Sequence, residues 1–282
     1  MSRLSQPSQG SPIEVYTTNS NTGGTYNYPD TQFVTMTGMR FLASDGREFV
    51  IVANAGTALA AGHLVASPVA IAGHGGRTVA TFTAYSANGN VPASLTFTTA
   101  TTAVYSNQYA GGFLITETNT GAGQTLRIAS NTGVAIGGTV SVTLENPDGQ
   151  NMTALDTTTT VSLFASRYGS GAQMNDNTGV AQSLATGGVV VNPTVGSNLN
   201  PIGASTYAIP ASTATFASFG LVQKGGFANL LNDLGTAAGL DIAPSTNVAG
   251  AVLTYAVLTG TRVGRAVETG TTAQYSLCFV QF

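Results

Sequence analysis

The sequence predicts an all-β protein, built from antiparallel β-sandwich or β-barrel domains behind an extended N-terminal arm. In one short run, Val140, Val142 and Leu144 alternate with hydroxyl side chains, as in a strand with one buried face. Similar runs rich in β-branched residues recur along the chain and are separated by turn signals such as Asp45-Gly46. Closely spaced runs of this kind are typical of hairpin-connected sheets.

The composition indicates a folded chain with an unusually neutral surface. Its 282 residues are enough for two domains that each bury a core. Charged residues make up 7% of the chain, far below the roughly 25% of ordinary soluble domains. Disordered chains share this polar bias but lack apolar runs such as Phe49–Val52 and Phe279–Phe282.

The charge pattern and the N-terminus exclude several classes of partner. The net charge is −3, with one lysine against eight arginines, so no basic stripe could follow a nucleic-acid backbone. No window approaches the ~18 apolar residues of a membrane span, and no signal peptide is visible. We therefore expect synthesis in the cytoplasm, with neither a nucleic-acid nor a membrane partner. The single cysteine, Cys278, is expected to be a small buried hydrophobe.

An internal similarity suggests the domain organisation. The segment Asn54–Ser67 aligns with Asn232–Ser245 with small gaps, each following a strand-like run. A chance match between Gly/Ala/Thr-rich segments explains this equally well. If the match is real, residues 31–75 and 187–282 form one β base domain, residues 76–186 are an inserted β domain, and residues 1–30 are the N-terminal arm.

One segment fits either a helix or a strand. Phe227, Leu230, Leu231 and Leu234 follow helical spacing. The segment also follows an apolar run across Lys224-Gly225-Gly226, as the second strand of a hairpin would. We favour the strand.

A search for catalytic chemistry indicates that the chain is not an enzyme. His63 and His74 lie in glycine-containing turns with no Cys, Asp or Glu at a metal-ligand spacing. The loop 145–151 resembles a calcium loop only superficially, because it lacks the acidic run of an EF-hand. Phosphate-binding glycine frameworks and a GxSxG nucleophile elbow are also missing from the sequence. We expect no catalytic residue, no cofactor and no metal.

Three stretches carry a resemblance to a known group of proteins. They are Asn107–Ile115 with Thr120–Ile128; Gly138–Pro147 with Ala154–Thr158 and Val161–Leu163; and the C-terminal run from Phe219 through Gly239, Pro244-Ser245, Gly250–Val252 and Val263–Val267 to Tyr275–Leu277. In order and spacing they resemble tailed-phage structural proteins taken to be capsid decoration, or cement, proteins that stabilise the head.

The resemblance implies a virion protein on the outer capsid surface that binds and stabilises the lattice of the major capsid protein. Its partners would be that protein and further copies of itself, most simply as a homotrimer, because several weak contacts together give avidity. The alternative is a tail-fibre or host-recognition module that binds carbohydrate, since phage fibres share this composition. A major capsid or tail-tube subunit is a third possibility, weakened because no long helix is evident.

The N-terminal arm, residues 1–30, is the expected contact element. Its Ser/Asn/Gly/Pro composition cannot bury enough apolar surface to offset the roughly 1–2 kcal/mol per residue needed to order a backbone. We therefore expect it to become ordered only against the capsid or neighbouring subunits, although a tail without a role is also possible. Its expected contact residues are the apolar and aromatic ones: Ile13, Val15, Tyr16, Tyr26 and Tyr28.

Overall fold

A computed structural model describes residues 37–54, 58–68, 70–85, 92–145, 155–169, 190–191, 201–210, 219–245, 247–255 and 261–282. Within these ranges the chain is nearly all β, as predicted, and its one helical element is a short 3₁₀ turn, η2 (Ala72–His74). No helix in the described part of the chain is long and apolar enough to cross a membrane. All of the predicted N-terminal arm, residues 1–30, lies outside the described residues, and with it the five expected contact residues, Ile13, Val15, Tyr16, Tyr26 and Tyr28.

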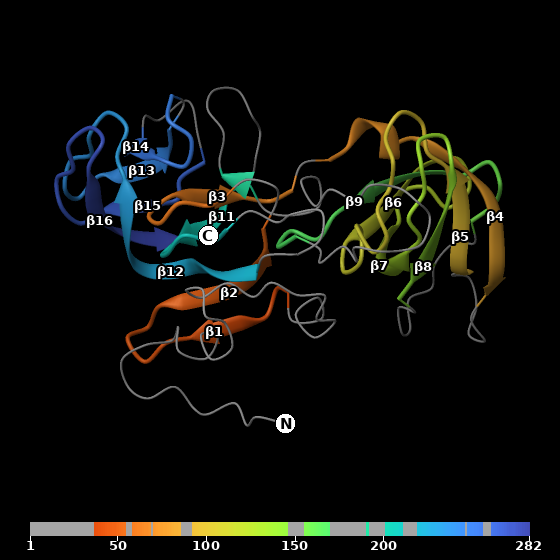
Figure 1. Cartoon of the computed structure of the whole chain (residues 1–282), viewed down its shortest axis with the longest axis horizontal. Coiled ribbons are helices and arrows are strands. Elements are labelled where there is room, and N and C mark those ends of the chain that lie inside the picture. The colour runs from red at the N-terminus through yellow and green to blue at the C-terminus, as the bar shows by residue number, and fades with distance from the viewer. Residues whose placement is uncertain are drawn as a thin grey trace.

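Figure 1 shows two β units side by side, a barrel and a larger base. The strands are β1 (Arg40–Leu42), β2 (Glu48–Ala53), β3 (Leu64–Ala66), β4 (Arg77–Tyr85), β5 (Pro92–Thr98), β6 (Phe113–Thr118), β7 (Thr125–Asn131), β8 (Thr139–Leu144), β9 (Thr160–Phe164), β10 (Val190–Val191), β11 (Pro201–Ser205), β12 (Phe219–Leu231), β13 (Asp241–Pro244), β14 (Val252–Thr254), β15 (Gly264–Ala266) and β16 (Tyr275–Gln281).

The barrel closes through antiparallel pairs in the order β4-β5-β8-β7-β6-β9. The alternation predicted for β8 is confirmed, because Val140, Val142 and Leu144 are buried while Thr139 and Thr143 face solvent. The buried side chains of all six strands form one continuous core inside the barrel. Closure of the ring removes the unpaired strand edges that an open sheet would expose.

The base is one ten-stranded sheet, organised around the 13-residue strand β12. The segment that also fitted a helix is a strand, but the predicted hairpin turn at Lys224-Gly225-Gly226 is wrong. The chain continues through these residues as one strand with a β-bulge, and Gly225 pairs with both Glu48 of β2 and Gln281 of β16. The bulge suits glycine, because Gly226 has a φ of 92°, which a side chain would disfavour.

The base consists of two copies of one strand arrangement that share β12. The first repeat comprises β2, β3, β10, β11 and the first half of β12; the second comprises the other half of β12, β13, β14, β15 and β16. In each repeat the first strand pairs with the last, and the second strand pairs with both the third and the fourth. An isolated bridge also recurs, as Leu59 with Ile209 and as Thr236 with Gly270. The strand topology is therefore duplicated.

Equivalent residues make equivalent hydrogen bonds in the two repeats. Gly62 and Gly239 both have a positive φ, of 73° and 79°, and their N–H groups donate to Ser205 and Ala266 respectively.

In each repeat, a side chain at an equivalent position accepts a hydrogen bond from the backbone of the last strand. The Leu221 N–H donates to the Tyr207 hydroxyl at 2.5 Å, and the Leu277 N–H donates to the Glu268 carboxylate at 2.7 Å. In both repeats a buried asparagine, Asn54 or Asn232, ends the first strand. The similarity between Asn54–Ser67 and Asn232–Ser245 thus coincides with a structural repeat.

The barrel interrupts the first repeat between β3 and β10, where the second repeat has only a short connection from β13 to β14.

The duplication predicts that Gly264 and Gly203 tolerate no side chain. A Cβ on Gly264 would collide with the Phe279 carbonyl oxygen and lie 3.0 Å from the Val280 Cα, and one on Gly203 would lie 2.7 Å from the Gln223 carbonyl oxygen. Each substitution to alanine should lower the free energy of unfolding by at least about 1–3 kcal/mol, measured by urea denaturation. Gly225→Ala is the control, because its Cβ would make only ordinary contacts with the Glu48 side chain, at 3.6 Å from Cβ and 3.9 Å from Oε2. Equal stability of all three variants would contradict the assigned packing.

Candidate functional site

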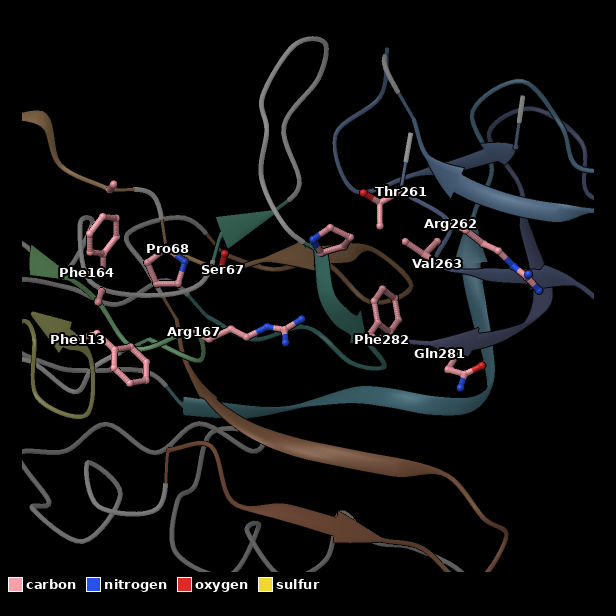
Figure 2. Close-up of a pocket in the computed structure, with 13 residues that line it drawn as sticks. Ser67, Pro68, Phe113, Phe164, Arg167, Thr261, Arg262, Val263, Gln281 and Phe282 are labelled. Carbon is pink, nitrogen blue, oxygen red and sulfur yellow. The ribbon is translucent and has the colours of Figure 1, made fainter. Parts of the chain in front are cut away.

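A cleft of about 780 Å³ lies between the barrel and the base (Figure 2). Phe113, Phe164, Ala165 and Arg167 form its barrel side. The base side comes from segments far apart in the sequence: Ser67, Pro68 and Ala70 after β3, Pro201 of β11, Thr261, Arg262 and Val263 before β15, and the C-terminal Gln281 and Phe282. The cleft therefore requires both units.

Two phenylalanines form an aromatic wall on the barrel side. Phe113 of β6 and Phe164 of β9 are register partners on adjacent strands, and both are exposed. The close approach behind them depends on Gly112, where a Cβ would collide with the Phe164 carbonyl. Exposed aromatic rings beside a hollow are suited to stacking against an apolar or sugar surface.

The arginines of the cleft differ in their pairing. Arg262 forms an ion pair with Asp241 of β13 at 3.1 Å, and both side chains are partly exposed. Figure 2 shows the Arg167 side chain extending into the cleft toward Phe282. Within the described ranges Arg167 has no carboxylate partner within salt-bridge distance. The cleft can therefore offer this guanidinium to an acceptor on a ligand.

Next to the cleft, Tyr168 connects the barrel to the base. The Lys224 ammonium donates to the Tyr168 hydroxyl at 3.3 Å, and the Tyr168 carbonyl accepts from the Ala53 N–H. Burial would raise the pKa of the Tyr168 phenol. Hydrogen bonds from Lys224 and Arg40, with the positive charges of Lys224 and Arg167, outweigh burial and lower that pKa. The only lysine in the sequence, Lys224, is thus buried and holds a tyrosine at the junction.

Both histidines form internal hydrogen bonds. His74 is fully buried, with Nδ1 bonded to the Tyr109 hydroxyl and Nε2 lying 3.1 Å from the Thr102 carbonyl. His63 is half-buried, with Nδ1 3.2 Å from the Ala249 carbonyl. Burial lowers the pKa of each ring below its usual 6.5. Neither lies in the cleft, so neither imidazole is placed to act there.

The remaining reactive groups are also engaged or buried. Cys278 is fully buried, which confirms its prediction as a small hydrophobe, and burial raises the pKa of its thiol. The buried Asp233 carboxylate accepts from the Ser245 hydroxyl at 2.6 Å and from the Asn247 amide at 3.0 Å. No cluster of three or more His, Cys, Asp or Glu side chains that could hold a metal ion occurs among the described residues. The calcium-like loop lies almost wholly outside them, with Glu145 alone described.

Sequence reasoning did not identify the cleft residues. Phe113 lies in one strand and Arg167 in the turn after another, and Arg262 lies almost a hundred positions further along the chain. The resemblance did include Asn107–Ile115, which contains Phe113, but as a pattern of strands and turns. Only the spacing of exposed aromatic residues could have indicated an open face.

We predict that the barrel loses stability as the pH falls through about 6.5. Burial lowers the pKa of His74 in the folded protein, so as the pH falls through 6.5 the unfolded chain binds protons before the folded chain does. Hydrogen–deuterium exchange of barrel peptides, corrected for intrinsic exchange, should show protection at pH 7.5 decreasing toward pH 5.5. His74→Gln should flatten this dependence, whereas His63→Gln should leave it in place. An unchanged slope in His74→Gln would contradict the assignment.

No family model matches this chain, and neither the curated proteins nor the solved structures compared with it contain a match. Among the described residues, the cleft with its three phenylalanines and two arginines is the candidate binding surface.

Proposed function

We propose that this chain is a structural virion protein that binds the outer surface of an icosahedral phage capsid and stabilises the lattice of its major capsid protein. The resemblance of residues 107–282 to capsid decoration proteins supports this role. So does a fold in which the described histidines and the cysteine have structural positions. The protein would act as a homotrimer, without enzymatic activity.

The observation that carries the proposal is the uneven distribution of exposed apolar side chains. Three lie on the barrel: Phe113, Ile136 and Phe164. Most lie on the base: Met39, Leu42, Phe227, Leu234, Leu240, Val248, Val267, Tyr275 and Phe279. Exposed apolar side chains that adjoin one another, as Phe227 and Phe279 do, mark an interaction surface. The base would therefore contact the shell, and the barrel would project from it.

The interaction test compares two exposed side chains of similar size. Leu42 of β1 is 78% exposed on the base, and Ile136 is 66% exposed on the barrel. We expect Leu42→Asp to lower occupancy on purified shells at least tenfold, because a charge would be desolvated at the contact. Ile136→Asp should leave occupancy unchanged. Measurement requires co-sedimentation with shells and imaging of virions with and without the protein. A greater loss of shell occupancy in Ile136→Asp than in Leu42→Asp would overturn the proposal. So would virions that lack the protein and have lost density from the tail.

A second candidate function is favoured by the cleft. Paired Phe113 and Phe164, with the Gln281 amide and the Arg167 guanidinium near them, are the kinds of group that bind a sugar ring in tail-fibre modules. If this is the function, a glycan array should detect binding that Phe164→Ser abolishes and Ile136→Ser preserves. Absence of glycan binding by the folded wild-type protein would remove this candidate.

A further inference from the structure

The two repeats of the base differ in how fully one face of the sheet is buried. Phe49 of β2 and Phe227 of β12 occupy equivalent positions, since each lies five residues before the asparagine that ends its strand. Phe49 is 1% exposed and Phe227 is 54% exposed. The same residue type at the same place is therefore covered in one repeat and open in the other.

In the first repeat the edge strand β1, which pairs with β2, brings Phe41 beside Phe49. Phe49, Ile51 and Leu221 form a small core against Phe41 and Ala43, which belong to β1 and its turn. Tyr207 also packs there, and Glu268 takes its place in the second repeat. β1 has no counterpart in the second repeat, because the first strand of that repeat is the second half of β12 and follows the first half without a turn. The open face therefore lacks the edge strand that flanks its equivalent.

The open face presents a specific chemistry. Phe227 and Phe279 are cross-strand partners whose rings meet edge to face, 5.5 Å apart. Beside Phe279, a hollow of about 420 Å³ is lined by Arg262, Arg265 and Val267, among others. The Arg265 Nε donates to the Gly239 carbonyl, and within the described part of the chain this guanidinium has no carboxylate partner. A suitable occupant would be an apolar, aromatic segment with one carboxylate.

We propose that this face of the second repeat, built around Phe227, Phe279 and Arg265, binds residues 13–16 from the N-terminal segment of a second copy of the chain. Ile13-Glu14-Val15-Tyr16 supplies aliphatic, acidic and aromatic groups within four positions. Glu14 complements Arg265, and the apolar side chains complement the Phe227–Phe279 pair. The segment would take the place beside Phe227 that Phe41 has beside Phe49 in the first repeat.

The length of the N-terminal segment permits residues 13–16 of one copy to reach another copy. Twenty residues separate Tyr16 from Thr37, where the described chain begins, and an extended chain spans about 3.3 Å per residue. Each copy carries one donor segment and one acceptor face, so a closed ring of copies leaves none unused. This inference rests on the oligomer in the proposed function, and it names the contact that would hold that oligomer together.

Disulfide trapping tests the proposal in solution. Asn229 is exposed on β12, two residues from Phe227 and therefore on the same face, so Val15→Cys with Asn229→Cys should form a cross-link under mild oxidation. Copies grown on heavy nitrogen are mixed with ordinary copies before oxidation, and cross-linked peptides are identified by mass spectrometry. We expect peptides that join one heavy and one light chain. Val15→Cys with Thr143→Cys, on the exposed surface of the barrel, should form none.

Substitutions in the face sharpen the result. Phe279→Ser in the cross-linking background should abolish the trapped product, and Phe113→Ser, which alters an equally exposed phenylalanine of the barrel, should preserve it. Cross-links confined within single chains, or absent, would overturn the proposal. Occupancy on the capsid shell is measured separately. If the protein occupies the shell but no cross-link forms, only this inference fails. If the cross-link forms but the protein does not bind the shell, only the capsid role fails.

Discussion

The base depends on the register of one strand, β12, which closes the first repeat and opens the second. A slip of one residue would turn every side chain of a strand to the opposite face, so both repeats constrain the same register. At the bulge, the Lys224 carbonyl accepts from the Phe282 N–H at 3.0 Å and the Lys224 ammonium reaches Tyr168. The C-terminus, the return from the barrel and both repeats therefore meet at one irregularity.

The all-β class could be predicted from the sequence because alternation is a local signal. Val140, Val142 and Leu144 show their buried face directly, and Asp45-Gly46 marks the β1–β2 turn, where Gly46 has a φ of 81°. The bulge at Lys224-Gly225-Gly226 could not be predicted, because glycine serves a hairpin turn and a bulge equally well. The distinction depends on pairing with Glu48 and Gln281, which are distant in the sequence.

The duplication of the base and the cleft both depend on geometry that local sequence patterns record poorly. The sequence similarity between the repeats was faint, because the equivalent positions are defined by backbone geometry. Tyr207 and Glu268 perform one task with unlike side chains, and Gly62 and Gly239 match because both need a positive φ. The cleft is assembled from strand ends of two units. No local pattern records which ends will face each other, and the predicted contact residues of the N-terminal arm lie outside the described structure.

The place where the barrel enters the base has a consequence for how the protein can diversify. β3 and β10 are antiparallel neighbours, joined at Ala66 and Val190, so the entry and exit of the barrel lie close together. A domain inserted through two adjacent chain ends leaves the surrounding sheet intact. Such a position therefore tolerates the replacement of one inserted domain by another. The second repeat has the equivalent position between β13 and β14, closed by the Ser245–Asp233 hydrogen bond. The base thus has two equivalent insertion positions. The one between β13 and β14 could accept a second inserted domain, either in evolution or in a protein engineered for display.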